Sequence, residues 1–345
     1  MRVLITGSGG LIGSEAASHW LKKGCKVYGL DNNTRQTLFG PGGDVTPVIR
    51  SLSKNSKYNH VHISITDREA VLNALRDIEP DVVIHTAAQP SHDKAADIPF
   101  EDFNINAVGT LNLLEATRLY SKDATFIHVS TNKVYGDGPN NLEISESRLR
   151  YDFSSEKYLN GIDENFSIDQ NLHSLFGASK ASADLLAQEY GRYFGMNTGI
   201  FRGGCLTGPQ HAGVELHGFL SYIVKCAVEG KRYKIFGYKG KQVRDQIHCR
   251  DVVSCFERFI ESPRKGEVYN LGGEKKNSAS VLEVIQKIES LTGHSLDYEY
   301  VDKNRIGDHI CYYTDMSKFK SHYPGWEIST SLDDIICEIS EQRSR

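Results

Sequence analysis

Two kinds of apolar pattern alternate along the first part of the chain. Residues 2–6 are a short apolar run, residues 11–22 carry apolar side chains at helical spacing, and residues 26–30 form a second run that ends at Asp31. This order predicts a strand, a helix and a second strand. The same patterns predict strands over 61–65, 81–85 and 124–130 and a long helix over 103–120. Strands that alternate with helices predict an α/β fold with a doubly wound parallel sheet, whose ligands bind at the carboxyl ends of the strands.

The pattern becomes less regular in two segments and in the last part of the chain. Residues 36–57 are rich in Gly, Pro and Ser, and residues 137–171 are polar and aromatic, so both are predicted as loops over a site. A strong helical pattern follows over 179–194, then a strand over 234–236 and helices over 251–261 and 280–292. We therefore predict a sheet core over 1–175, a core helix and strand over 176–200, and a smaller C-terminal α/β region over 201–345 that binds substrate.

Composition narrows the class of ligand. The 345 residues are 39% hydrophobic and 24% charged, and the formal net charge is -4 with no basic stripe. This favours a small-molecule substrate over nucleic acid or an anionic membrane. No apolar run approaches the roughly 18 residues of a spanning helix, and the first strand leads into glycines instead of a signal-peptide cleavage site, so we expect a cytoplasmic protein. The 7 cysteines and 13 histidines lack paired ligand spacing, and no metal site is predicted.

A glycine loop lies between the first predicted strand and helix. Gly7, Gly10 and Gly13 stand where glycines permit a tight turn and a close approach of a pyrophosphate to the helix N-terminus. Together with Asp31 at the end of the second strand, this is the dinucleotide-binding context of a Rossmann sheet. Asp31 can accept hydrogen bonds from the adenosine ribose and repels a 2'-phosphate, which favours NAD over NADP. Arg35 could instead neutralise such a phosphate, or it could be an exposed loop charge.

Several longer motifs carry a family resemblance. They are HTAAQ at 85–89, GTLNLLEA at 109–116, STNKVYGD at 130–137, FGASK at 176–180, GKQVRD at 240–245 and NLGG at 270–273. With these motifs the chain resembles the extended short-chain dehydrogenase/reductases that modify nucleotide sugars. STNKVYGD in particular is similar to the CDP-paratose 2-epimerases, also called CDP-tyvelose epimerases. The resemblance covers nearly the whole chain and implies an NAD-dependent isomerase that acts on a nucleotide-activated hexose.

The resemblance implies a catalytic trio in which one member is altered. Thr131 would hydrogen-bond the reacting sugar hydroxyl, a tyrosine would remove its proton, and Lys180 would hold the nicotinamide ribose and lower the tyrosine pKa. Phe176 occupies the tyrosine position, and a phenyl ring cannot exchange a proton. Three explanations stay open: an engineered Tyr-to-Phe change, a natural enzyme with another acid/base, and a natural binding protein without catalysis. The intact surroundings favour the engineered, inactive variant.

The two residues after Thr131 bear on the reaction. Dehydratases of the family carry Asp-Glu at this point, whereas this chain has Asn132 and Lys133. That difference disfavours dehydration, which needs an acid, and leaves epimerisation or simple oxidoreduction. In an epimerase NAD takes a hydride from a sugar carbon and returns it to the other face of the keto intermediate. The subgroup resemblance implies C2 of a CDP-sugar; local residues alone leave a 4-epimerase or a dehydrogenase open.

The resemblance also implies the remaining contacts. Ser64 stands where relatives place an aspartate near the adenine. The implied cofactor contacts are Gly7, Gly10, Leu11, Ile12, Gly13, Asp31, Asn32, Asn33, Arg35, Ser64, Ile65, Ala87, Ala88, Gln89, Asn106, Ser130 and Lys180. The implied substrate contacts are Thr131, Asn132, Lys133, Arg202, Arg244, Arg305 and Asp308, of which Arg202 could instead pair within the core. Family membership further implies a homodimer through the helices over 106–120 and 179–194.

Overall fold

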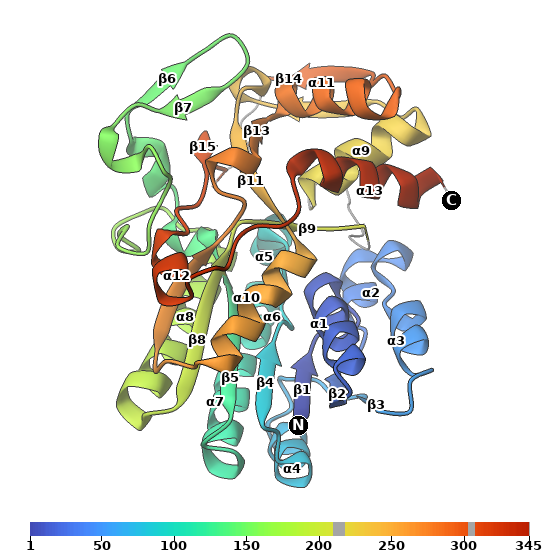
Figure 1. The fold of residues 1–345 in the computed structure, drawn as a ribbon, viewed down its shortest axis with the longest axis vertical. Helices are drawn as coiled ribbons and strands as arrows, with labels where there is room; N and C mark the ends of the chain where they lie inside the picture. Colours follow the sequence, from blue (N-terminus) through green and yellow to red (C-terminus); the bar gives the residue numbers. More distant parts are fainter. Residues whose placement is uncertain (210–217, 303–307, 345) are drawn as a thin grey trace. The chain divides into compact units, whose positions relative to one another are not determined.

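The computed structural model describes residues 1–209, 218–302 and 308–344 (Figure 1). The chain forms two compact units. The first unit comprises Met1–Val134, Leu175–Arg202 and Val252–Tyr269, and the second comprises Tyr135–Ser174, Gly203–Asp251 and Asn270–Arg345. The units therefore alternate along the chain, whereas the sequence suggested the consecutive ranges 1–175, 176–200 and 201–345. A helix and an edge strand from residues beyond 250 return to the first unit, because they complete its sheet.

The first unit is built on a seven-stranded sheet. Its strand order is β12-β8-β5-β4-β1-β2-β3, and β3, β2, β1, β4 and β5 pair in parallel. The strands are β1 (Arg2–Thr6), β2 (Lys26–Leu30), β3 (Tyr58–Val61), β4 (Val82–His85), β5 (Thr125–Thr131), β8 (Asn197–Gly203) and β12 (Glu267–Leu271). This confirms the predicted doubly wound α/β sheet. The third strand lies earlier than the predicted range 61–65, because Tyr58 already pairs with Val27 of β2.

Helices flank this sheet and connect its strands. They are α1 (Leu11–Lys22), α2 (Thr34–Phe39), α3 (Thr46–Leu52), α4 (Arg68–Ile78), α5 (His92–Asp97), α6 (Pro99–Phe103), α7 (Gly109–Tyr120), α8 (Leu175–Phe194) and most of α10 (Cys249–Glu261). A π-helical turn over Asn104–Val108 joins α6 to α7, so the predicted long helix over 103–120 is interrupted there. A buried cluster with Leu4, Val83 and Phe126 of the strands packs against Leu75 of α4 and Leu113 of α7.

The segment over 36–57 was expected to be a loop, and this expectation was wrong. It contains most of α2 and all of α3, whose first turn holds a proline. Asn33 explains the local fold, since its side chain accepts from Val45 N at 3.1 Å and donates to Asp44 Oδ1 at 2.8 Å. Val45 and Leu52 are buried, which gives these short helices an apolar anchor. Side-chain hydrogen bonds of this kind leave no periodic pattern in the sequence.

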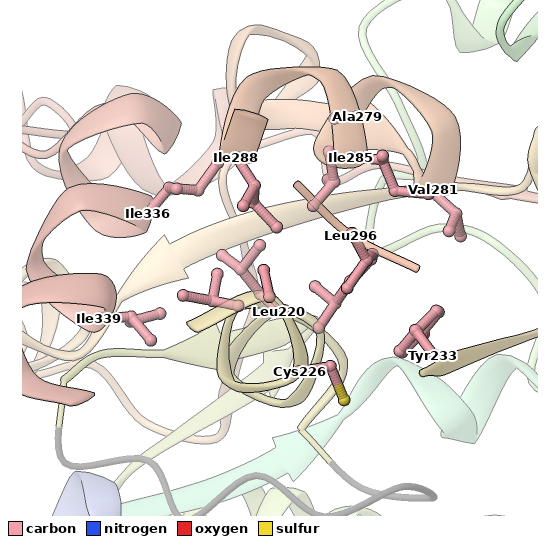
Figure 2. Packing of buried hydrophobic residues seen from close by; sticks show 14 of the residues in the cluster. Leu220, Cys226, Tyr233, Ala279, Val281, Ile285, Ile288, Leu296, Ile336 and Ile339 are labelled. Carbon is pink, nitrogen blue, oxygen red and sulfur yellow. The ribbon is translucent and has the colours of Figure 1, made fainter. Parts of the chain in front are cut away.

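The second unit contains smaller sheets and a core of its own. Its strands are β6 (Ile144–Glu146), β7 (Tyr151–Phe153), β9 (Cys205–Thr207), β10 (Tyr233–Phe236), β11 (Val243–His248), β13 (Ser278–Ser280), β14 (Tyr298–Val301) and β15 (Cys311–Tyr312). Its helices are α9 (Phe219–Glu229), α11 (Val281–Thr292), α12 (Ser317–His322) and α13 (Leu332–Ser344). Figure 2 shows side chains of α9, α11 and α13 meeting in one apolar cluster, among them Leu220, Ile288 and Ile339. The predicted loop over 137–171 is mostly irregular but includes the antiparallel hairpin β6–β7.

Across the residues that the structure describes, every helix is too short or too polar to cross a bilayer.

Candidate active site

The glycine loop leaves the N-terminus of α1 open to an anion. Gly7 has φ +65°, and a Cβ on Gly13 would lie 2.2 Å from the Gly7 carbonyl oxygen. Gly10 is the N-cap residue and supplies no side chain to cap the helix, which leaves backbone N–H groups for a ligand. Leu11 and Ile12 begin α1, and Ile12 is buried. This geometry fits the pyrophosphate of a dinucleotide.

Asp31 ties the glycine loop to the segment that follows β2. Its Oδ2 accepts from Gly9 N at 3.0 Å, and its Oδ1 accepts from Asn33 N at 2.8 Å. Both oxygens keep lone pairs for a ribose. Asn32 accepts from the Thr34 hydroxyl at 2.6 Å, and the Arg35 guanidinium lies 5.6 Å from the centre of the Phe39 ring. Asn32 and Asn33 thus order the backbone beside Asp31.

The predicted adenine-side and strand-end residues also lie in the first unit. Ser64 shares a hydrogen bond with Thr66 at 2.7 Å, and the Ile65 carbonyl accepts from Asn112 Nδ2 at 3.0 Å. Ala87 and Ala88 follow β4, and Ala87 N donates to Thr6 Oγ1 at 3.2 Å. Gln89 is buried immediately after them. These residues follow strands β3 and β4 at the carboxyl edge of the sheet.

His85 links this edge to the π-helical turn that carries Asn106. Thr110 donates to the Asn106 carbonyl at 2.6 Å and accepts from His85 Nε2 at 2.9 Å. His85 Nδ1 then lies 2.8 Å from Thr6 Oγ1, which can donate to it. Burial lowers the pKa of His85 to about 3, so the ring is neutral and serves as a structural bridge.

A buried carboxylate that the sequence analysis missed positions the start of α8. Asp102 accepts from Gln89 Nε2 at 2.7 Å and Asn106 Nδ2 at 3.1 Å through Oδ1, and from the Ser179 hydroxyl at 2.6 Å through Oδ2. Ser179 also lies 3.1 Å from the Phe176 carbonyl oxygen. Asp102 is 1% exposed, and its place four residues before Asn106 was the available sequence signal.

Lys180 of α8 reaches the backbone of β5 two residues before Thr131, the last residue of that strand. Lys180 Nζ donates to the Val129 carbonyl at 2.8 Å, and burial lowers the lysine pKa to about 8, although Asp184 and Asp102 oppose this shift. Thr131 Oγ1 accepts from Lys133 N at 3.2 Å and lies 3.5 Å from Asn132 Oδ1. Phe176, at 7% exposure, is on the first turn of α8.

A second buried carboxylate, also missed, accounts for two predicted site residues. Asp184 accepts from the Ser130 hydroxyl at 2.6 Å and from Arg202 Nε at 3.0 Å through Oδ2, and from Arg202 Nη2 at 2.9 Å through Oδ1. The structure therefore places Arg202 in the core ion pair that the sequence offered as its alternative role. Asp184 follows Lys180 by one helical turn, which would have been the signal for it.

Two predicted substrate contacts, Arg244 and Asp308, lie in the second unit. Arg244 Nη2 donates to Asp308 Oδ1 at 2.5 Å and also to the His309 carbonyl. Asn140 fixes the backbone there, because it donates to the Asp308 carbonyl at 2.9 Å and accepts from Ile310 N at 2.7 Å. Arg305 lies outside the described residues. In the same unit Tyr135 is fully buried, and its hydroxyl donates to Asn270 Oδ1 at 2.6 Å.

Comparisons with known proteins agree with this arrangement. Residues 3–272 match the model of the NAD dependent epimerase/dehydratase family. The chain is 35% identical over 296 residues to the CDP-paratose 2-epimerase of Salmonella typhi, and the match covers 84% of each chain. It is 29% identical over 346 residues to a dTDP-glucose 4,6-dehydratase of Salmonella typhimurium, covering 95% of this chain and 88% of the relative.

A solved structure is similar over the full length. It is a Tyr-to-Phe mutant of UDP-glucuronic acid 4-epimerase from Bacillus cereus in complex with UDP-4-deoxy-4-fluoro-glucuronic acid and NAD. The TM-score is 0.81 at 28% identity, with 100% of this chain and 99% of that chain covered. The sequence match over most of the chain and the shared fold lead to one conclusion: the chain belongs to the NAD dependent epimerase/dehydratase family.

Proposed function

We propose that the chain is built for NAD-dependent epimerisation of a nucleotide-activated hexose, at C2 of a CDP-sugar, through a keto intermediate. The observation that carries this proposal is the end of β5. There Thr131 is followed by Asn132 and Lys133, and the buried Lys180 donates to the Val129 carbonyl of the same strand. An amide and an amine replace the acid pair that water elimination needs. The CDP-paratose 2-epimerase at 35% identity supports C2 and CDP, and both stay proposals for this chain.

In this proposal the protein residues bind and orient the cofactor and the sugar nucleotide, and a hydroxyl at position 176 would exchange the proton. NAD, when bound, accepts a hydride from the sugar carbon and returns it to the opposite face. Thr131 hydrogen-bonds the reacting hydroxyl, and the Lys180 ammonium holds the nicotinamide ribose. The lowered pKa of Lys180 follows from its burial, and the positive charge there stabilises a neighbouring anion. Arg244, Asp308 and Arg305 are the proposed partners of the nucleotide diphosphate and ribose, whereas Arg202 supports Asp184.

Phe176 removes the group that would take the proton from the sugar hydroxyl. We favour an inactive Tyr-to-Phe variant, because the surrounding residues Thr131, Ser179 and Lys180 are retained and ordered. The Bacillus cereus mutant, solved with a sugar nucleotide and NAD, supports the expectation that such a change leaves binding intact. Phe176 equally supports a second candidate, a protein that binds NAD and a nucleotide sugar without turnover. The 4-epimerase among the solved relatives keeps C4 chemistry as the alternative reaction.

A homodimer is part of the proposal. In the first unit, exposed apolar side chains gather on α7 and α8: Leu111 and Leu119 on the former, Leu185, Tyr193 and Phe194 on the latter. Because α7 and α8 pack together, these side chains could form one face for a second copy. Sedimentation equilibrium of the full chain measures the mass directly.

Restoring the hydroxyl tests the proposed reaction. Phe176→Tyr should raise turnover of a CDP-hexose by roughly a hundred- to ten-thousand-fold, because it returns the proton acceptor. Product stereochemistry, resolved by NMR after incubation with CDP- and UDP-hexoses, identifies the inverted carbon and the preferred base. Phe100→Tyr, at an exposed phenylalanine of α6, is the control for an added hydroxyl and should leave the rate unchanged.

Two results would contradict the proposal. Equal activity of the Phe176 and Tyr forms would show that another residue exchanges the proton. Inert Phe and Tyr forms that both bind NAD and CDP-hexose would favour the binding protein. Sequencing the natural gene decides separately whether Phe176 is engineered.

A further inference from the structure

Two buried hydroxyl groups meet across strand β2. The oxygen atoms of Tyr58, the first residue of β3, and Ser8, in the glycine loop, lie 2.9 Å apart. Ser8 is 0% exposed and Tyr58 is 6% exposed. β2 runs between β1 and β3 in the sheet, so the tyrosine ring must cross β2 to reach the loop.

Gly29 of β2 makes room for this crossing. A Cβ at Gly29 would lie 2.1 Å from the Tyr58 hydroxyl oxygen and 2.5 Å from Ser8 Oγ, closer than any real contact. Gly29 and Tyr58 lie on one face of the sheet, because Val27 pairs with Tyr58 and side chains alternate along a strand. Glycine at 29 is therefore what allows a side chain from β3 to hold the glycine loop.

The neighbouring residue of the loop is held in two further ways. Gly9 N donates to Asp31 Oδ2 at 3.0 Å, and the Gly9 Cα faces Val45, whose Cβ would lie 2.6 Å from a Cβ at position 9. Ser8 and Gly9 thus receive support from β3, from the end of β2 and from the turn before α3. The loop conformation depends on these side chains as well as on its own glycines.

We propose that the Tyr58–Ser8 hydrogen bond positions the glycine loop for the diphosphate of the dinucleotide. Tyr58 is a positioning residue in this inference: it holds Ser8 so that the N–H groups at the start of α1 face the phosphate oxygens. Loss of either hydroxyl leaves its partner buried without that bond, and the loop relaxes away from the shape that binds the diphosphate. The inference rests on the dinucleotide site alone and is independent of the sugar chemistry.

Two ligands, each measured with the unmodified chain and with Tyr58→Phe, test whether Tyr58 positions the diphosphate-binding loop or only stabilises the fold. ADP-ribose contains the diphosphate, and its dissociation constant, measured by isothermal titration calorimetry, should rise by roughly three- to tenfold in Tyr58→Phe. Adenosine lacks the diphosphate, and its dissociation constant, measured by NMR titration, should stay the same. Tyr28→Phe, which removes a hydroxyl on the opposite face of β2, is the matched control and should change neither value.

Ser8→Ala provides the second variant and completes a double-mutant cycle. It should weaken ADP-ribose binding as Tyr58→Phe does, and the double variant should lose no more than either single one. Native ADP-ribose affinity in either single variant overturns the inference, and so does an equal loss for adenosine and ADP-ribose. Because neither ligand carries a hexose, failure of the epimerase proposal in the sugar assay leaves these results unaffected.

Discussion

Two buried carboxylates of the first unit, Asp102 and Asp184, both influence Lys180, yet their surroundings differ. Asp184 faces the guanidinium of Arg202 and is charge-compensated, whereas the bonds to Asp102 come from the neutral side chains of Gln89, Asn106 and Ser179. Burial raises the pKa of Asp102, and its hydrogen bonds with Ser179 and Gln89 oppose the shift. Asp184 therefore stabilises a fixed charge in the core, whereas Asp102 orders neutral side chains at the start of α8.

The largest effect is expected where a buried guanidinium would lose its carboxylate partner. Asp184→Asn removes the partner of the buried Arg202 and should lower the free energy of unfolding by about 3–5 kcal/mol. The amide compensates only in part: its oxygen can accept from one side of the guanidinium, but its NH₂ group then faces another donor, and the amide carries no charge to balance that of Arg202. Urea denaturation measures the change.

Asp77→Asn, at an exposed carboxylate on α4, is the control for this substitution. It should change the free energy of unfolding by less than about 0.5 kcal/mol. A cost below about 1 kcal/mol for Asp184→Asn would remove the distinction between the two carboxylates.

An effect of intermediate size is expected at Lys180, whose pKa both carboxylates raise. Burial lowers the pKa of Lys180 to about 8, below the usual value of 10.5 for a lysine. Between these two values the unfolded chain binds more protons than the folded one, so the stability due to this group rises with pH. Relative to Lys180→Met, the native chain should gain about 1–3 kcal/mol of unfolding free energy as pH rises from 8 to 10.5.

The same pH series ranks the two carboxylates. Asp184 raises the pKa of Lys180 more than Asp102 does. In Asp184→Asn the rise of unfolding free energy with pH should therefore begin at a lower pH than in Asp102→Asn. Lys22→Met, at an exposed position of α1, controls for the loss of one positive charge. If the difference in unfolding free energy between the unmodified chain and Lys180→Met does not change with pH, the Lys180 ammonium is solvated.

The sequence predicts features formed by neighbouring residues better than contacts between residues that are far apart in the chain. Strand, glycine loop, helix and acidic strand end follow one another within 31 residues, so β1, α1, β2 and Asp31 were found from spacing alone. Asp102 and Ser179 lie 77 positions apart, and spacing cannot join them. Arg202 illustrates the same limit, because an arginine in a strand suits a phosphate and a buried aspartate equally well. The helices α2 and α3 were missed since Asn33 and buried Val45, and not periodicity, hold them.

The smallest effect is expected at Asp102. Asp102→Asn keeps one oxygen, which can still accept from Gln89 and Asn106, and its new NH₂ group can donate to Ser179 Oγ. Ser179 would then donate to the Phe176 carbonyl, already 3.1 Å away. The network stays satisfied, and the free energy of unfolding should fall by about 1 kcal/mol or less in the same urea measurement. Asp102→Ala removes the acceptor shared by Gln89, Asn106 and Ser179, and each of these side chains keeps one other acceptor. It should therefore cost about 1–3 kcal/mol more than Asp102→Asn. A loss for Asp102→Asn as large as that for Asp184→Asn would show that the Asp102 charge itself, acting on Lys180, holds the start of α8 in place.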